Sequence, residues 1–502
     1  MDGQTWSLLL DGFAIALQPE LLLYSLAGAF LGTVVGVLPG IGPAGAVALL
    51  LPVMSVIDPI GAVIMLAATY TGSMYGGSTT SILLRIPGDT SAVVATLDGH
   101  EMAKQGRAGT ALCIAAIGSY IAGTIAVGGL MIIGPIIAEA ALAFGSPEYF
   151  ALYIFGLCAV AALAGKSLVK ALMAMCFGLM ISTVGEDIMG VRRFTFGSEY
   201  MWDGIQFLAV SLGLFALSEV IINAGLMKRN ELGEVIQHRI YIKFREVIEA
   251  IGSIFRGGIV GFLVGVLPGA GAGVATFIAY SLERQISRHP ERFGKGEIKG
   301  LAGPEAANNA ASAGAFVPML ALGIPGSSTT AIMLGAFLML NIHPGPMLFL
   351  ERPDVVWGLI AALYVGNIML LILNLPLIGI FVRILYTPMH VLLVIIVVFA
   401  VIGTYLNDGL TLTLLFLVAF GVIGYFMREH DFPLAPVILG VVLGGRMEES
   451  FRQSMTMSQG NIYEFLDHPI VLGFLLASAA FLMLPVIMRR RGGPQTLVED
   501  DD

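Results

Sequence analysis

The sequence predicts an all-α polytopic membrane protein, and three observations support this class. Apolar residues make up 57% of the 502 residues, charged residues make up 12%, and the mean hydropathy is +0.88. Soluble proteins carry about 25% charged residues. No polar block of the chain is long enough to form a soluble domain. These features exclude an ordinary soluble enzyme, and the net charge of −9 argues against a nucleic-acid-binding protein.

Long uncharged runs define the expected membrane segments. A helix that crosses a bilayer needs about 20 apolar residues, so some runs hold one span and the longest hold more. We therefore expect about 10 to 12 membrane segments. The uncharged runs are 21–57, 59–84, 109–138, 257–282, 306–350, 355–382, 409–427 and 469–488.

The placement of Lys and Arg predicts the orientation in the membrane. The chain has no basic residue before Arg85, and its basic clusters lie near 104–107, 166–170, 228–256, 284–299 and 489–491. Cytoplasmic loops are enriched in Lys and Arg, so these clusters are expected in the cytoplasm and the N-terminus outside. The side of the mixed segment 446–467 stays open. The first residues lack the basic start of a signal peptide.

Cysteine, histidine and nucleotide-binding patterns give no sign of a cofactor or a catalytic centre. The three cysteines, Cys113, Cys158 and Cys176, lie in apolar segments and are expected to be core residues. The seven histidines show no metal-ligand spacing. Phosphate-binding, dinucleotide-binding and hydrolase motifs are missing from the sequence. We therefore expect no cofactor and no enzymatic activity.

The chain contains an internal repeat. Gly36-Val-Leu-Pro-Gly recurs at Gly265, 229 residues later, and Ile86-Pro-Gly recurs at Ile324, 238 residues later. The difference falls where the second copy carries the charged loop 283–299. The expected organisation is a first transmembrane half (1–227), a polar cytoplasmic linker (228–250), a second transmembrane half (251–490) and a disordered acidic tail (491–502).

Flanking charges predict how the two copies are related. Arg256 and Arg284 flank the first hairpin of the second copy, whereas no basic residue flanks its counterpart in the first copy. The copies are therefore expected to enter the membrane from opposite faces. Such inverted repeats are typical of secondary transporters, which bind substrate near the midplane at broken helices. A parallel repeat is the alternative.

Each copy interrupts apolar sequence with Gly and Pro, at 36–45 and 265–273. Proline removes a backbone donor, so we expect broken or re-entrant hairpins, and unwound backbone at membrane depth lines a cavity or is buried. Freed N–H groups bind anions and freed carbonyls bind cations. The substrate contacts expected here are Gly40, Gly42, Gly269 and Gly271. Close helix packing is the alternative role of these glycines.

Hydroxyl and amide clusters lie next to the second break of each copy, and we expect both hydroxyl clusters to line one cavity. The predicted substrate contacts are Ser78, Thr79, Thr80, Gly88, Asn308, Asn309, Gly326, Ser327, Ser328 and Thr329. The sodium-ligand candidates among them are Ser78, Thr79, Asn308, Ser328 and Thr329. The alternative is that the hydroxyls bond only to their own helices.

Arg85 and Asp89 are unusual charges between apolar segments, and charges within a membrane are costly and often functional. We expect Arg85 to meet an anionic substrate and Asp89 to belong to the same site. An Arg85–Asp89 ion pair near the cytoplasmic interface is the alternative. The following segment, 97–109, is expected to be an exposed loop.

Five motifs together resemble the TctA-type large membrane subunit of tripartite tricarboxylate transporters, and the resemblance runs from about residue 20 to 490. They are Tyr75-Gly-Gly-Ser78, Ile86-Pro-Gly88, Leu97-Asp-Gly99, Pro304-Glu-Ala-Ala-Asn-Asn-Ala310 and Leu322-Gly-Ile-Pro-Gly-Ser327. The resemblance implies a small four-helix membrane subunit and a periplasmic solute-binding protein as partners. It also implies a location in the bacterial inner membrane and uptake driven by sodium or protons. In that membrane, the external N-terminus predicted from the basic residues lies in the periplasm.

The resemblance therefore implies a permease subunit that imports a carboxylate. Many relatives have a small polar residue at the position of Arg85 and Glu at that of Asp89. The substrate can therefore be a dicarboxylate or a related organic acid as well as a tricarboxylate. A standalone ion-coupled transporter is one alternative. An intramembrane enzyme, with Asp89 and Glu305 as its acid and base, is a remote one. The sequence does not identify the carboxylate, the cation, the stoichiometry or the oligomeric state.

Overall fold

A computed structural model of the chain describes residues 3–38, 40–163, 167–226, 242–384, 387–463 and 467–490. Eight of its helical stretches are long and apolar enough to cross a membrane, and shorter apolar helices of 10 to 17 residues accompany them. Apart from the short pair of β1 (Gly185–Glu186) and β2 (Arg192–Arg193), the described elements are helical. The predicted all-α polytopic class is confirmed. The predicted acidic tail, 491–502, lies outside the described residues.

The described chain forms two compact units. The first unit contains Met1–Leu142 and Gln206–Tyr425, and the second contains Ala143–Ile205 and Phe426–Asp502. These units do not follow the two sequence halves, because the first unit holds the repeated elements of both copies. Most of the predicted linker (228–250) lies outside the described residues, but its last residues are helical, since α11 begins at Phe244.

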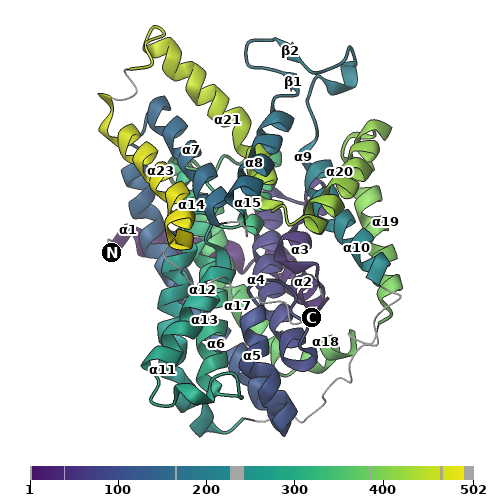
Figure 1. Ribbon diagram of the computed structural model, residues 1–502, viewed down its shortest axis with the longest axis vertical. Coiled ribbons are helices and arrows are strands. Elements are labelled where there is room, and N and C mark those ends of the chain that lie inside the picture. The colour runs from purple at the N-terminus through teal and green to yellow at the C-terminus, as the bar shows by residue number, and fades with distance from the viewer. Residues whose placement is uncertain are drawn as a thin grey trace. The chain divides into compact units, whose positions relative to one another are not determined.

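The first unit is built around two corresponding groups of helices, shown in Figure 1. In the first copy, α2 (Pro19–Val37) packs along α4 (Pro59–Leu84), and α3 (Gly42–Leu50) contacts both. In the second copy, α11 (Phe244–Val266) packs along α13 (Ile298–Gly314), and α12 (Gly271–Ile286) contacts both. The helix α14 (Phe316–Leu322) then continues the path of α13 to the second break.

Glycines bring the paired helices of each copy into backbone contact. A Cβ atom at Gly32 in α2 would lie 2.3 Å from the carbonyl oxygen of Thr69 in α4. A Cβ atom at Gly261 in α11 would lie 2.3 Å from the carbonyl oxygen of Ala307 in α13. The same relation holds one turn before and one turn after each glycine, as is typical of small-residue helix packing in membranes. These contacts confirm the internal repeat.

Contacts between the copies show that they run antiparallel. Along α4, the Tyr70 ring lies 5.9 Å from the ring of Phe316, and two turns later Ser78 contacts Glu305 in α13. The residue number of the contact in the second copy therefore falls as the residue number along α4 rises. Since α4 corresponds to α13 and α14 in the repeat, equivalent helices point in opposite directions. The predicted inverted relation of the copies is confirmed.

Other helices of the first unit surround this pair of copies. The helix α6 contacts α11, α13 and α17, and α17 also contacts α1, α2 and α4. Their bounds are α1 (Gly3–Ala16), α5 (Val93–Met102), α6 (Ala108–Ala141), α9 (Phe207–Ser211), α10 (Ser218–Leu226), α15 (Ser328–Met339), α16 (Pro346–Glu351), α17 (Pro353–Asn374), α18 (Ile378–Ile384), α19 (Met389–Asp408) and α20 (Thr411–Glu429).

The second unit contains α7 (Ser146–Leu163), α8 (Leu168–Ser182), α21 (Ala435–Met457) and α23 (Pro469–Arg490). Two ion pairs join its loop after α8 to α21. Arg193 bonds Glu448 at 2.9 Å, and Arg452 bonds Asp187 at 3.0 Å. Backbone N–H groups and Arg452 stabilise the charged form of the Asp187 carboxyl, and they lower its pKa.

The expectation of a loop over 97–109 is wrong, because the segment is helical, and of its residues only Leu97 and 104–106 are exposed. Asp98 is fully buried within α5, and its carboxylate accepts hydrogen bonds from the backbone N–H groups of Gly294, Gly296 and Glu297 at 2.8 to 3.0 Å. It also accepts one from the Tyr280 hydroxyl at 3.1 Å. Asp98 therefore fastens the charged loop that only the second copy carries. These internal bonds account for Asp98, whereas Lys104 and Gln105 are exposed to solvent.

Candidate functional site

The first break of each copy separates two helices, as predicted. α2 ends at Val37 and α3 begins at Gly42, while α11 ends at Val266 and α12 begins at Gly271. Gly40 and Gly42 have φ of +89° and +61°, and Gly269 and Gly271 have φ of +79° and +64°. Glycine adopts such left-handed backbone without steric cost, which explains the repeated Gly-x-Gly spacing.

The second breaks also correspond in detail. The residue after α4, Arg85, has φ of 60°, and the residue after α14, Gly323, has φ of 71°. Three residues further on, a Cβ atom at Gly88 would lie 2.9 Å from the Gly36 carbonyl oxygen, and one at Gly326 would lie 3.0 Å from that of Gly265. Each second break therefore packs against the first break of its own copy.

The breaks of the two copies also approach each other. A Cβ atom at Gly42, at the start of α3, would lie 3.3 Å from the Asp89 side chain. A Cβ atom at Gly273, near the start of α12 in the other copy, would lie 3.3 Å from the Thr90 hydroxyl. Asp89 and Thr90 thus contact the starts of the short helices of both copies, and α15 of the second copy packs against α3 of the first.

The two charged residues of this region do not pair with each other in the described structure. Asp89 accepts hydrogen bonds from the Ser91 hydroxyl at 2.8 Å and from the Ala92 N–H at 3.1 Å. Arg85 is exposed at the end of α4, and no ion pair joins it to a described residue. The guanidinium is therefore available to an anionic ligand, whereas the Asp89 carboxylate orders the turn before α5.

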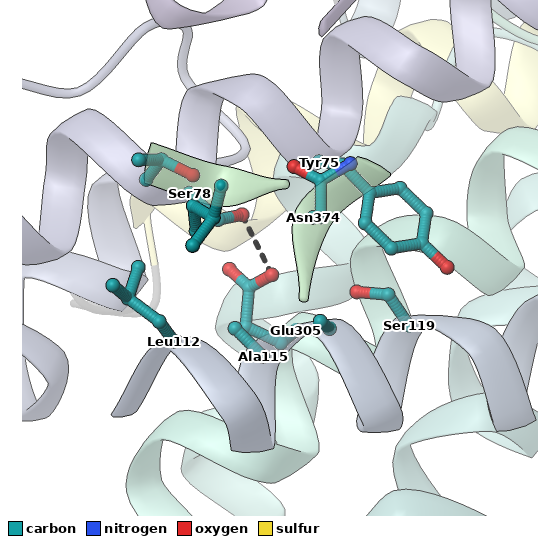
Figure 2. Close-up of a pocket in the computed structure, with 10 residues that line it drawn as sticks. Tyr75, Ser78, Leu112, Ala115, Ser119, Glu305 and Asn374 are labelled. Atoms are coloured by element: carbon teal, nitrogen blue, oxygen red, sulfur yellow. Dashed lines mark hydrogen bonds between the residues drawn. The ribbon is translucent and has the colours of Figure 1, made fainter. Parts of the chain in front are cut away.

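A small cavity lies beside Ser78 and Thr79 (Figure 2). The Ser78 hydroxyl donates a hydrogen bond of 2.6 Å to Glu305, whose side chain is only 1% exposed. The cavity volume of about 10 Å³ suits one water molecule and excludes an organic acid. Its lining residues come from α4, α6, α13, α17 and α18: Tyr75, Ser78, Thr79, Leu112, Ala115, Ala116, Ser119, Glu305, Asn374 and Ile378.

The second hydroxyl cluster lies elsewhere. Ser327 and Thr330 form reciprocal hydrogen bonds that cap the N-terminus of α15, and the Ser327 hydroxyl lies 3.3 Å from that of Tyr70. Tyr70 precedes Ser78 by two turns of α4, which is about 12 Å. The second cluster does not line the cavity beside Ser78. The expectation that both clusters line one cavity is therefore not met in this structure.

The predicted hydroxyl ligands fall into two groups. Thr80 bonds to the Gly77 carbonyl of its own helix at 3.0 Å, and Ser327 is the cap described above. By contrast, Thr79, Ser328 and Thr329 have no hydrogen-bond partner among the described residues, and Thr79 and Thr329 are each only 3% exposed. These three hydroxyls are the ones left available for a ligand.

The two predicted amides of α13 also differ. Asn309 donates a hydrogen bond of 2.6 Å to Ser119, which lines the cavity. Asn308 is fully buried, and both polar atoms of its side chain are without a partner among the described residues. A buried amide without partners is costly, so Asn308 remains a ligand candidate.

Sequence reasoning missed Asn374 and Ser119 as lining residues of the cavity, and it named Glu305 only for the rival enzyme. Asn374 and Ser119 lie in mostly apolar helices, and only the tertiary contacts bring them to Glu305. The sequence could have identified Glu305 as a candidate, because it is an acidic residue in a long apolar region close to two asparagines.

The fold and the site define a class: a polytopic α-helical membrane protein with inverted repeats, whose broken helices meet around polar groups, as in secondary transporters. The family model of the tripartite tricarboxylate transporter TctA family matches residues 22–439, and the chain belongs to this family. This confirms the family resemblance.

Two curated relatives come from Agrobacterium vitis. One is described as an uncharacterized 52.8 kDa protein in the TAR-I ttuC' 3'region, and it is 42% identical over 494 residues, covering 98% of both chains. The other is described as an uncharacterized protein in the TAR-II ttuC' 3'region. It is 42% identical over 244 residues, which are 48% of this chain and all of the relative. No solved structure matches the chain.

Proposed function

We propose that the chain is the permease subunit of a binding-protein-dependent secondary transporter, which imports an organic carboxylate with the energy of an ion gradient. The observation that carries this proposal is the meeting of the two copies at their breaks, beside an exposed, unpaired Arg85. A guanidinium suits a carboxylate because it offers several N–H donors in a planar fork. Tricarboxylates, dicarboxylates and related organic acids all fit this chemistry.

Alternating access supplies the mechanism of this proposal. Inverted repeats allow one bundle to present the same site first to one side of the membrane and then to the other. The cavity beside Ser78 is too small for an organic acid, so the substrate path is closed around this point and has to open between the copies. The backbone of Gly42 and Gly271, at the starts of α3 and α12, supplies further N–H donors for the substrate.

The partners we propose are a small membrane subunit and a periplasmic solute-binding protein. The family description supports them, because it names a tripartite transporter. Reconstitution tests the proposal: proteoliposomes with all three components should accumulate a carboxylate when an inward sodium or proton gradient is imposed. Little uptake at micromolar substrate is expected from this chain alone. Full saturable uptake by the chain alone would favour a standalone transporter, and no uptake of any carboxylate by the complete system would refute the proposal.

The proposed location is the bacterial inner membrane with a periplasmic N-terminus. A Thr5→Cys variant, in a background without the three native cysteines, should react with a membrane-impermeant thiol reagent in cells whose outer membrane alone has been permeabilised. Reaction only after the inner membrane is opened would place the N-terminus in the cytoplasm. The cysteine-free parent provides the control for unspecific labelling.

A further inference from the structure

We propose that the cavity beside Ser78 binds one sodium ion, with the Glu305 carboxylate as its anionic ligand. The binding site follows from the geometry described below. The role of the ion in driving uptake rests in addition on the proposed function. Glu305, Asn374 and Ser119 are the new residues in this assignment, alongside Ser78 and Thr79 (Figure 2).

The charge of Glu305 requires a positive partner. Its side chain is 1% exposed, and Ser78 supplies a neutral hydrogen bond at 2.6 Å. No Lys or Arg of the described chain forms an ion pair with it. A carboxylate taken out of water without a countercharge is strongly destabilising, so either a cation or a proton has to neutralise it.

The other oxygens at the cavity favour a cation over a proton. Asn374 is 3% exposed, and its amide nitrogen donates to the Leu370 carbonyl at 3.0 Å, while its amide oxygen has no partner among the described residues. The Thr79 hydroxyl also has no partner there, and the Ser119 hydroxyl accepts only from Asn309. A protonated carboxyl offers a single O–H donor, so it could satisfy only one of these oxygens, whereas a cation bound among them would interact with all of them at once.

Size and charge then indicate the kind of cation. The space of about 10 Å³ holds one water-sized particle, which excludes a hydrated ion or the substrate. Carboxylate, amide and hydroxyl oxygens are hard ligands and suit hard cations. One carboxylate balances one positive charge, which favours a monovalent ion. A bare sodium ion, which is smaller than a water molecule, fits this space, and potassium, which is about as large as water, is the competitor that the test below separates from it.

The position of the cavity gives the ion a means to couple to transport. Ser78 and Thr79 belong to α4 of the first copy, and Glu305 belongs to α13 of the second copy. An ion bound to both helices stabilises the arrangement in which the copies are closed at this point. A ligand that binds one arrangement better shifts the protein toward it.

Sodium-dependent thermal stability of the purified full-length chain tests the site without any transport assay. At fixed pH and ionic strength, replacing choline with sodium should raise the unfolding temperature in a saturable manner, and replacing choline with potassium should raise it less. The Glu305→Gln and Asn374→Ala variants should each require at least about tenfold more sodium for half of the shift, which corresponds to 1.4 kcal/mol.

A matched control is the Glu148→Gln variant. Glu148 is also a buried carboxyl, but it is already paired with His468 at 2.7 Å, so this variant should keep the full sodium-dependent shift. If Glu305→Gln does not yield folded protein, Glu305→Asp and Asn374→Ala carry the test. Glu305→Asp keeps the charge and shortens the reach by one methylene group, so its sodium requirement should also rise.

The outcomes separate the site from the proposed function. An unchanged sodium requirement in both Glu305→Gln and Asn374→Ala overturns the site, even if carboxylate uptake is found. Suppose that acid stabilises the wild-type chain, that this effect requires Glu305, and that sodium does not stabilise the chain. The cavity then binds a proton, and the proposed sodium site is overturned. A sodium shift that needs Glu305, in a system that imports no carboxylate, upholds the site and overturns the proposed function.

Discussion

The second breaks of the two copies have the same backbone and different chemistry. Arg85 and Gly323 end their helices in the same left-handed conformation, and Gly88 and Gly326 pack on equivalent carbonyl groups. The first copy, however, places a guanidinium where the second has no side chain. A positive φ in a residue other than glycine costs about 1 to 3 kcal/mol and tends to occur at functional sites. The repeat explains why the two breaks share a backbone conformation. The side chains that differ between the copies are the candidates for ligand binding.

A second departure lies on the long helices. Glu305 in α13 corresponds to Ala67 in α4 by the offset of 238 residues, and both side chains are buried. The first copy therefore supplies the exposed cation Arg85, and the second supplies the buried anion Glu305. Under the proposed function, this division would give the substrate anion and the coupling cation separate binding places, one in each copy.

The largest effects are expected at the glycines that pack the paired helices of each copy in the same way. Gly32→Val and Gly261→Val would each force a side chain into a carbonyl oxygen 2.3 Å away, separating α2 from α4 or α11 from α13. Overpacking costs about 1 to 3 kcal/mol and more against backbone, so both variants should lose most folded protein. Fluorescence-detected size exclusion in detergent measures this loss.

Gly473→Ala provides the control for these variants, because a Cβ atom there meets nothing within 4 Å among the described residues. Its yield should equal that of the wild type. A normal yield for Gly261→Val with a poor yield for Gly32→Val would show that the copies do not pack equivalently.

The next largest effect concerns the loop that only the second copy carries. Asp98→Ala would leave three backbone N–H groups of this loop without their acceptor. Hydrogen bonds to charged groups contribute about 1.5 to 3 kcal/mol each, so the loss should exceed 2 kcal/mol. The unfolding temperature in detergent measures it. A value equal to the wild type would show that the loop is not held through Asp98.

Arg85→Gly should separate function from stability. Glycine relieves the left-handed strain, so the unfolding free energy should rise by about 1 kcal/mol, while carboxylate uptake by the complete transporter should fall at least about tenfold. Arg85→Lys keeps the charge and the strain, and it should retain part of the uptake. Normal uptake by Arg85→Gly would remove Arg85 from the substrate site.

The smallest effects are expected among the hydroxyls. Ala substitutions at Thr79, Ser328 and Thr329, which have no described partners, should each weaken substrate or cation affinity by up to about tenfold with normal expression. Ser327→Ala should instead cost about 1 kcal/mol of stability, because it removes the cap of α15. Thr411→Ala is the control, since Thr411 is an exposed residue away from the breaks. The apparent affinities are measured as uptake at varied substrate and sodium concentrations.

The sequence predicted the fold class, the repeat, its inversion and the breaks, because each depends on local signals. Uncharged runs indicate membrane helices, and Gly with Pro in such runs indicates broken ones. The basic residues that flank only the second copy predicted that the two copies are inverted. The site could be predicted only in part. Ser78, Thr79 and Arg85 carried local signals, whereas the contributions of Asn374 and Ser119 depend on which helices pack together.

Two sequence expectations failed for a common physical reason. The sequence does not show which hydrogen-bond partners a polar side chain meets after folding. Asp98 looked solvated, yet backbone N–H groups from a segment almost 200 residues away surround it. Ser78 and Ser327 looked like partners in one cavity, yet Ser78 bonds Glu305 and Ser327 caps α15.

Cross-linking in native membranes tests the inverted arrangement of the copies most directly. Paired cysteine substitutions would be made in a background without native cysteines and treated with a short bifunctional thiol reagent. The account predicts cross-links for Tyr70→Cys with Phe316→Cys and for Ser78→Cys with Glu305→Cys, and none for Tyr70→Cys with Glu305→Cys or for Ser78→Cys with Phe316→Cys. The opposite pattern would mean that α4 and α13 run parallel, and it would contradict the inverted repeat.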